Sequence, residues 1–184
     1  VGAAYVDRKE RMRLTHFSSI GYAKDPVTGF INFGPGVLAP GGDAWKHPEN
    51  KVFQDAVTSM NSTEGDPDPL MDANVVKVEG KPMAINMAGT SMSGPFVAAI
   101  TEGVAMGWEK MMKPVGPNQE LTSIRAAYLL ERTAKDLGYM HDLQHTGIVQ
   151  AAQAWKLMEQ LAKETREGKG EVLNGFNDFV NIGL

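Results

Sequence analysis

An apolar run from Pro95 to about Met112 constrains the fold of this chain more than any other segment does. Apolar residues occupy nearly every side of the helix that this run would form, and the small side chains of Ala98 and Gly103 would let other backbones approach closely. A helix with this pattern is buried rather than amphipathic. The turn Gly-Thr-Ser-Met at 89–92 stands directly before it. We therefore expect a buried helix that begins beside hydroxyl side chains.

The composition is that of an ordinary soluble globular protein. Of the 184 residues, 42% are apolar and 22% are charged, and the formal net charge is -4. The 18 Lys and Arg side chains are scattered among 22 acids rather than gathered on a basic face, so we expect no nucleic-acid partner. No apolar run approaches the roughly 20 residues that cross a bilayer, so we expect no membrane partner. Because the chain has no cysteine, disulfides and thiolate metal sites are excluded.

Short apolar strands precede the helical segments. Residues 1–6 and 37–39 have the pattern of buried strands, and Gly and Pro close the second one on both sides. Residues 75–78 and 83–86 flank a Glu-Gly-Lys-Pro turn, which predicts a hairpin. With the helices that follow, this order predicts an α/β fold, specifically a three-layer α/β/α sandwich with a mostly parallel sheet.

Two amphipathic helices are predicted after the buried one. In the first, apolar residues recur at three- and four-residue spacing from Leu121 to Ala134, with Thr122 or Asn118 as the cap. In the second, an apolar stripe occupies residues 151–161. We expect both apolar faces to belong to the core.

The domain organisation follows from composition. We assign residues 1–166 to one domain, or to a large part of one, with a surface insertion at 43–74 that is rich in Pro and Asp. Residues 167–184 begin with the linker composition Glu-Gly-Lys-Gly and are predicted to lead into a possible further module. Because residues 1–6 look like the middle of a buried strand and show no leader, we expect the chain to begin further upstream.

Acidic side chains in the insertion offer oxygen ligands of the kind that Ca²⁺ prefers. Their spacing fits no EF-hand loop, so a solvated acidic loop is the preferred interpretation and a structural Ca²⁺ cannot be assigned. The four acids are Glu64, Asp66, Asp68 and Asp72.

Two interpretations of the turn before the buried helix stay open at this point. In one, Thr90, Ser91 or Ser93 caps the helix, and Pro95 stands in its first turn. In the other, Ser91 is a nucleophile, because a hydroxyl at a helix N-terminus lies beside unpaired backbone N–H groups that can bind a developing oxyanion. Gly89 would then leave room for a substrate carbonyl.

Four blocks follow one another along the chain: VGA at 1–3 with FSSIG at 17–21, LAPG at 38–41, GTSMSGPFVA at 89–98 and GIVQAA at 147–152. In this order they resemble the subtilisin-like serine peptidases, the subtilases. The third block is the most specific, because it is similar to the family's nucleophile motif Gly-Thr-Ser-Met-Ala-x-Pro-His-Val-Ala. The resemblance extends from residue 1 to about residue 155.

The resemblance implies a serine endopeptidase that hydrolyses peptide bonds through an acyl-enzyme on Ser91. Gly89 and Thr90 would border the primary specificity site, and Phe17 would lie toward the leaving-group side of the cleft. Met92, directly after the nucleophile, would make activity sensitive to oxidation. The resemblance further implies a peptide or protein substrate, no cofactor, no catalytic metal and an extracellular or secreted location.

The remaining catalytic groups are expected outside this chain. The family order is Asp, then His, then Ser, with an oxyanion-binding Asn also upstream of the Ser. The missing N-terminal part of the catalytic domain would then be a partner of this chain, which alone would be inactive. The alternative is a noncatalytic pseudopeptidase or binding module that retains the fold and Ser91.

The four histidines of the chain lack the His-Gly-Thr-His setting of the family's catalytic histidine. We expect each of them to be a surface residue or a locally bonded one. They are His16, His47, His141 and His145.

Overall fold

The computed structural model describes residues 1–7, 9–18, 22–24, 31–33, 36–43, 55–60, 74–116 and 120–182. They belong to two compact units. The first contains Val1–Ile20 and Leu38–Phe96, and the second contains Gly21–Val37 and Val97–Leu184. Most of the predicted insertion, including its four acids, and also His47 lie outside the described residues.

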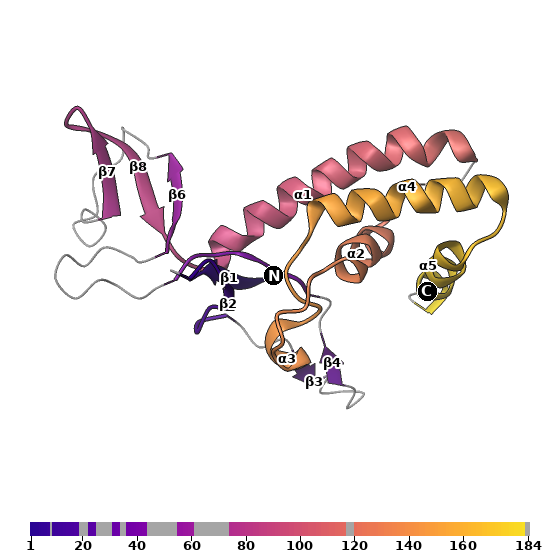
Figure 1. Ribbon diagram of the computed structural model, residues 1–184, viewed down its shortest axis with the longest axis horizontal. Helices are drawn as coiled ribbons and strands as arrows, with labels where there is room; N and C mark the ends of the chain where they lie inside the picture. Colours follow the sequence, from indigo (N-terminus) through magenta and orange to yellow (C-terminus); the bar gives the residue numbers. More distant parts are fainter. Residues whose placement is uncertain are drawn as a thin grey trace. The chain divides into compact units, whose positions relative to one another are not determined.

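One sheet of the first unit is built on strand β1 (Gly2–Val6), with the strand order β2-β1-β5 (Figure 1). Strand β2 (Met12–Leu14) pairs with β1 in the antiparallel sense, and β5 (Leu38–Pro40) pairs with it in the parallel sense. Ala3 lies opposite Ala39, and both are fully buried. The two strands predicted at 1–6 and 37–39 are therefore confirmed.

The second sheet of this unit has the strand order β6-β8-β7, and both pairs are antiparallel. Its strands are β6 (Val57–Met60), β7 (Val75–Val78) and β8 (Lys81–Met87). The turn between β7 and β8 places Glu79 and Gly80 at φ 52° and 79°, and two positive values suit a two-residue hairpin turn. The predicted hairpin is thus confirmed.

The second unit is mainly helical in the part of the chain that the structure describes. It also contains an antiparallel pair, β3 (Tyr22–Lys24) with β4 (Ile31–Phe33), and a 3₁₀ turn, η2 (Lys113–Val115). Helix α1, which begins in the first unit, continues into it. The helices are α1 (Thr90–Met111), α2 (Ser123–Arg132), α3 (His141–Gln144), α4 (Ala151–Glu167) and α5 (Glu171–Ile182).

Large apolar side chains hold α1 and α4 together within the second unit. Gly107 of α1 lies so close to α4 that a Cβ there would be 2.6 Å from the Trp155 ring and 2.7 Å from Met158 Cε. Trp108, next to it, is buried, and its ring lies 5.8 Å from that of Phe176 in α5. Figure 1 shows α1 and α4 running side by side. Of the predicted apolar stripe of α4, Ala154, Met158 and Leu161 are buried in the core, whereas Ala151 and Trp155 are exposed.

The N-terminus of α2 agrees with its predicted cap. The Thr122 side chain accepts a hydrogen bond from the Arg125 backbone N–H at 3.3 Å. Such a cap satisfies one of the amides that have no partner inside the helix. The other candidate, Asn118, lies outside the described residues.

The predicted three-layer α/β/α sandwich with a mostly parallel sheet is wrong. Among the described strands, β1 and β5 form the parallel pair, and the other pairs are antiparallel. A parallel sheet needs strands that are buried on both faces. In the second sheet, however, Met60 is 88% exposed and every described side chain of β8 is at least partly exposed.

Helix α1 differs from its prediction in burial and in its start. Met106 is 68% exposed and Phe96 is 41% exposed, so the expectation of a helix buried on all sides is wrong. The helix begins at Thr90, which places Pro95 inside the helix rather than in its first turn. A proline there has no N–H to donate to the carbonyl four residues earlier, which belongs to Ser91.

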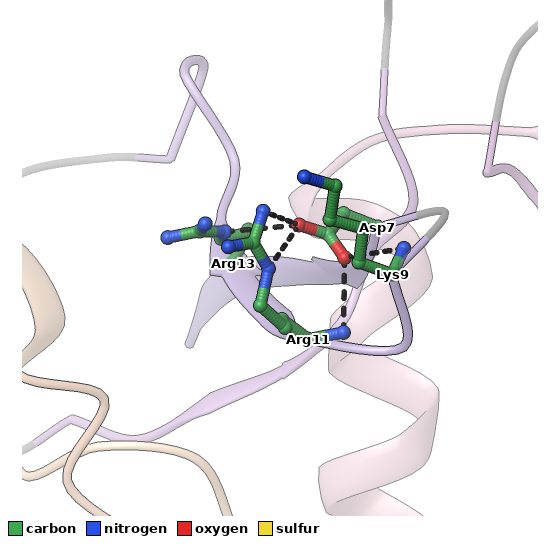
Figure 2. Close-up of polar contacts among 4 residues, drawn as sticks. All are labelled: Asp7, Lys9, Arg11 and Arg13. Atoms are coloured by element: carbon green, nitrogen blue, oxygen red, sulfur yellow. Dashed lines mark hydrogen bonds and ion pairs between the residues drawn. The ribbon is translucent and has the colours of Figure 1, made fainter.

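Asp7 organises the charged turn between β1 and β2 (Figure 2). Its Oδ1 accepts hydrogen bonds from the backbone N–H groups of Lys9 and Arg11, both at 2.9 Å. Its Oδ2 accepts from the Nε atoms of Arg11 at 2.9 Å and of Arg13 at 3.1 Å. These donors, with the Arg11 side chain first among them, hold the pKa of Asp7 well below its usual range.

We expect Asp7→Asn to lower the melting temperature at neutral pH, because the amide keeps one acceptor but loses the charge that binds the two arginines. Since folding lowers the pKa of Asp7 from its ordinary 3.8, the stabilisation is present above about pH 4 and is lost progressively below it. Melting curves from pH 7 to pH 2 should show the wild type and the variant converging in acid. A constant difference across this range would contradict the prediction, and Asp178→Asn on the exposed side of α5 serves as the control.

Candidate functional site

Ser91 lies in the first turn of α1 with its side chain exposed. No hydrogen bond joins its hydroxyl to the part of the chain that the structure describes. The backbone N–H groups of a first helical turn have no partners within the helix and carry partial positive charge. The first turn of α1 contains no acidic residue that would neutralise this charge. The hydroxyl is therefore open to solvent at the positive end of a 22-residue helix.

Ser93, two residues further along, has the opposite environment. It is fully buried, and its Oγ donates a hydrogen bond to the backbone carbonyl of Ala39 in β5 at 3.1 Å. Successive helical residues are about 100° apart around the axis, so residues two apart point to nearly opposite sides. Because Ser93 points to the sheet, Ser91 points away from it.

Gly41 lets the first turn of α1 approach the end of β5 closely. Its carbonyl accepts a hydrogen bond from the Gly89 N–H, and its own N–H donates to the Ala4 carbonyl, both at 2.8 Å. A Cβ at position 41 would lie 2.5 Å from Ser93 Oγ and 2.6 Å from the Cβ of Ala3. The absence of a side chain at Gly41 is therefore a condition for this packing.

Phe17 belongs to the same unit and follows β2 closely. The neighbouring Ser18 Oγ accepts a hydrogen bond from the Ala3 N–H at 3.0 Å, and the Thr15 N–H donates to the Ala3 carbonyl at 3.0 Å. Phe17 itself is half-buried, with its ring 5.4 Å from that of His16. These bonds attach the segment that carries Phe17 to β1.

The first unit thus contains residues 1–3, 17–18 and 38–41 of the first two sequence blocks and residues 89–96 of the third, whose last two residues belong to the second unit. Of the predicted site residues, Gly89 and Thr90 are half-buried beside the exposed Ser91. The fourth block lies in the second unit, where Gly147 packs on the Lys135 carbonyl with a φ of 112°.

Met92 folds its thioether back toward Gly89. A Cβ at position 89 would be 3.4 Å from Met92 Sδ, and the Met92 N–H donates to the Gly89 carbonyl at 3.0 Å. The side chain is half-buried, and its sulfur lies beside the predicted specificity residue Gly89. An oxygen added to this sulfur would increase both the bulk and the polarity of that region.

Sequence reasoning missed one pair of titratable side chains in the first unit. His16 Nδ1 lies 3.6 Å from Asp43 Oδ1; the carboxyl is buried and the imidazole is exposed. The two residues are 27 positions apart on different segments, and neither one has a local signal for the other. The sequence analysis also did not predict that Ser93 anchors the helical turn to β5. The spacing could have indicated it, because residues two apart in a helix point to nearly opposite sides.

Comparison of the chain with protein-family models, curated proteins and solved structures gives no match. Within the described residues, no cluster of three or more His, Asp or Glu side chains is arranged to hold a metal ion. In the same residues, none of the helices combines the length and the apolar character that a membrane span requires.

We expect Gly41→Ala to lower the free energy of unfolding by about 1–3 kcal/mol, because the new methyl group overlaps Ser93 and Ala3. Gly94→Ala is the matched control: a Cβ there meets nothing within 4 Å, and alanine favours the helix by about 1 kcal/mol. Urea unfolding of the two variants measures both effects. A Gly41→Ala variant as stable as the wild type would show that the first turn of α1 is not packed as described.

Proposed function

We propose that this chain is part of a subtilisin-like serine endopeptidase, in which Ser91 forms the acyl-enzyme. The observation that carries the proposal is the difference in environment between two serines in one helical turn. Ser93 is buried and bonded to the sheet, whereas Ser91 is exposed and has no hydrogen bond to the described part of the chain. A plain helix cap would use its hydroxyl to accept from a backbone N–H of the first turn.

In the proposed reaction, Ser91 Oγ attacks the carbonyl carbon of a peptide bond while a histidine takes its proton. The backbone N–H of Ser91 would donate to the oxyanion of the tetrahedral intermediate, since it lies in the first turn of α1. The intermediate collapses to an ester as the amine leaves, and water then releases the acid. We place the histidine, its aspartate and the second oxyanion donor, an asparagine, outside these 184 residues.

The substrate in this proposal is an extended peptide or protein. Gly89 and Thr90 would border the side chain that precedes the scissile bond, and Phe17 would lie toward the leaving group. We assign no cofactor to the reaction. An extracellular or secreted location is part of the same proposal and is supported by the resemblance in the sequence.

We expect a fluorophosphonate probe to label the complete protein, including the N-terminal part that supplies the histidine and aspartate, at Ser91, and Ser91→Ala to abolish the labelling. Ser123→Ala is the matched control, because Ser123 is also an exposed serine at the start of a helix. Mass spectrometry of the labelled peptide identifies the site. Labelling that survives Ser91→Ala would refute the proposal, and a folded complete protein that takes no label would favour the noncatalytic alternative.

In the complete protein, we expect Met92→Ala to keep most of its peptidase activity after peroxide treatment, whereas the wild type loses it. Oxidation converts the thioether beside Gly89 into a bulky, polar sulfoxide. Met106→Ala is the control, because Met106 is on the same helix and is more exposed. Activity on a peptide substrate, measured before and after oxidation, gives the comparison. Equal inactivation of Met92→Ala and the wild type would place Met92 away from the reacting groups.

A further inference from the structure

A cavity of about 540 Å³ in the second unit takes no part in the proposed hydrolysis. Residues from α2, α3, α5 and the segments on either side of α3 line it, and all of these described lining residues belong to the second unit. Its size is in the range of small-molecule sites, which are typically lined by aromatic side chains and a few polar groups. The lining residues that decide its chemistry are Tyr128, Glu131, Arg132, Asp136, His141 and Phe179.

Glu131 is the unusual member of this set. Its side chain is half-buried in the last turn of α2, and its carboxylate has no hydrogen-bond partner among the described residues. A negative charge at the C-terminal end of a helix is unfavourable, because the helix dipole is negative there. Burial raises the pKa of Glu131, and His141 opposes this only in part. A cation placed beside this carboxylate would therefore stabilise its charged form.

Other polar groups around the cavity already have partners within the chain. Asp136 Oδ1 accepts hydrogen bonds from the Gly138 N–H at 2.7 Å and from Gln144 Nε2 at 2.6 Å. The Gln144 side chain is buried, and it also accepts from the Leu137 N–H at 2.8 Å. Thr146 Oγ1 donates to the Gly36 carbonyl at 2.8 Å. This network holds the side chains on one side of the cavity in place. It does not involve the Glu131 carboxylate, which can accept a hydrogen bond from a bound molecule.

Aromatic rings form the opposite part of the lining. The Tyr128 and Phe179 rings are 5.2 Å apart at an interplanar angle of 60°, and Tyr128 packs edge-on against the buried Phe176 at 5.3 Å. Phe179 is 37% exposed, so part of its ring is accessible from solvent. Aromatic surfaces of this kind bind other rings by edge contacts and stabilise nearby cations.

We propose that this cavity binds a small primary amine with an aromatic body, its ammonium on the Glu131 carboxylate and its ring against Tyr128 and Phe179. The ammonium supplies donors for a carboxylate that accepts no hydrogen bond from the described residues, and the ring covers apolar surface. The Arg132 guanidinium also lines the cavity and would repel the ammonium from its side, which further directs it to Glu131. The inference does not depend on the chemistry proposed for Ser91.

Three probes of nearly equal shape and different charge test this assignment: benzylamine, benzyl alcohol and benzoate. Binding to the full chain is measured by titration calorimetry and by ligand-detected NMR at neutral pH. Because a charge-assisted hydrogen bond contributes more than a neutral one, benzylamine should bind about tenfold more tightly than benzyl alcohol. Glu131→Gln should remove this advantage, whereas Glu102→Gln on the exposed side of α1 should keep it.

Phe179→Ala is the second variant, and it should weaken benzylamine and benzyl alcohol by the same factor. Circular dichroism of each variant shows whether the fold is kept. Equal binding of benzylamine and benzyl alcohol to the wild type would overturn the proposal, as would tighter binding of benzoate or an undiminished preference in Glu131→Gln. Absence of binding by all three probes to the folded chain would overturn it as well.

Discussion

The hydrogen bond from the buried Ser93 hydroxyl to the Ala39 carbonyl is the contact on which the first unit depends. It joins the start of α1 to the parallel pair β1–β5 at the point where Gly41 allows the backbones to meet. A buried hydroxyl without a partner is costly, so this bond specifies one orientation of the helical turn. The orientation of Ser91 follows from it, because the two serines share that turn. The exposed hydroxyl is thus positioned by a neighbour that has no access to solvent.

The two units use different means to reach a defined structure. In the first, small residues and backbone hydrogen bonds dominate, as at Ala3 and Gly41, and a charged turn around Asp7 closes one end of the sheet. In the second, large rings fill the space between helices, with Trp108 and Phe176 in contact. In the first unit, the close approach of the backbones at Gly41 fixes the positions of the two serines. In the second unit, the packing of rings between the helices leaves a cavity that polar side chains also line.

Local chemistry made several features predictable. The β7–β8 hairpin, the Thr122 cap and the strands β1 and β5 each have their signal within a few neighbouring residues. The sheet architecture was not predictable in this way, because strand pairing depends on contacts between distant segments. The structure contains the parallel pair β1–β5. The prediction of a mostly parallel sheet, however, rested only on the fold class that the order of strands and helices suggested. Similarly, no pattern in the sequence indicates that the Glu131 carboxylate accepts no hydrogen bond from the described residues.

Pro95 has a consequence for how the exposed serine is held. In a regular helix, the backbone N–H of residue 95 would donate a hydrogen bond to the carbonyl of Ser91. Proline has no N–H, so this bond is not formed. The Ser91 carbonyl therefore lacks its bond in the hydrogen-bond ladder of α1, although the helix continues through this turn without interruption. The bond from Ser93 to the Ala39 carbonyl gives the same turn a second attachment, to the sheet.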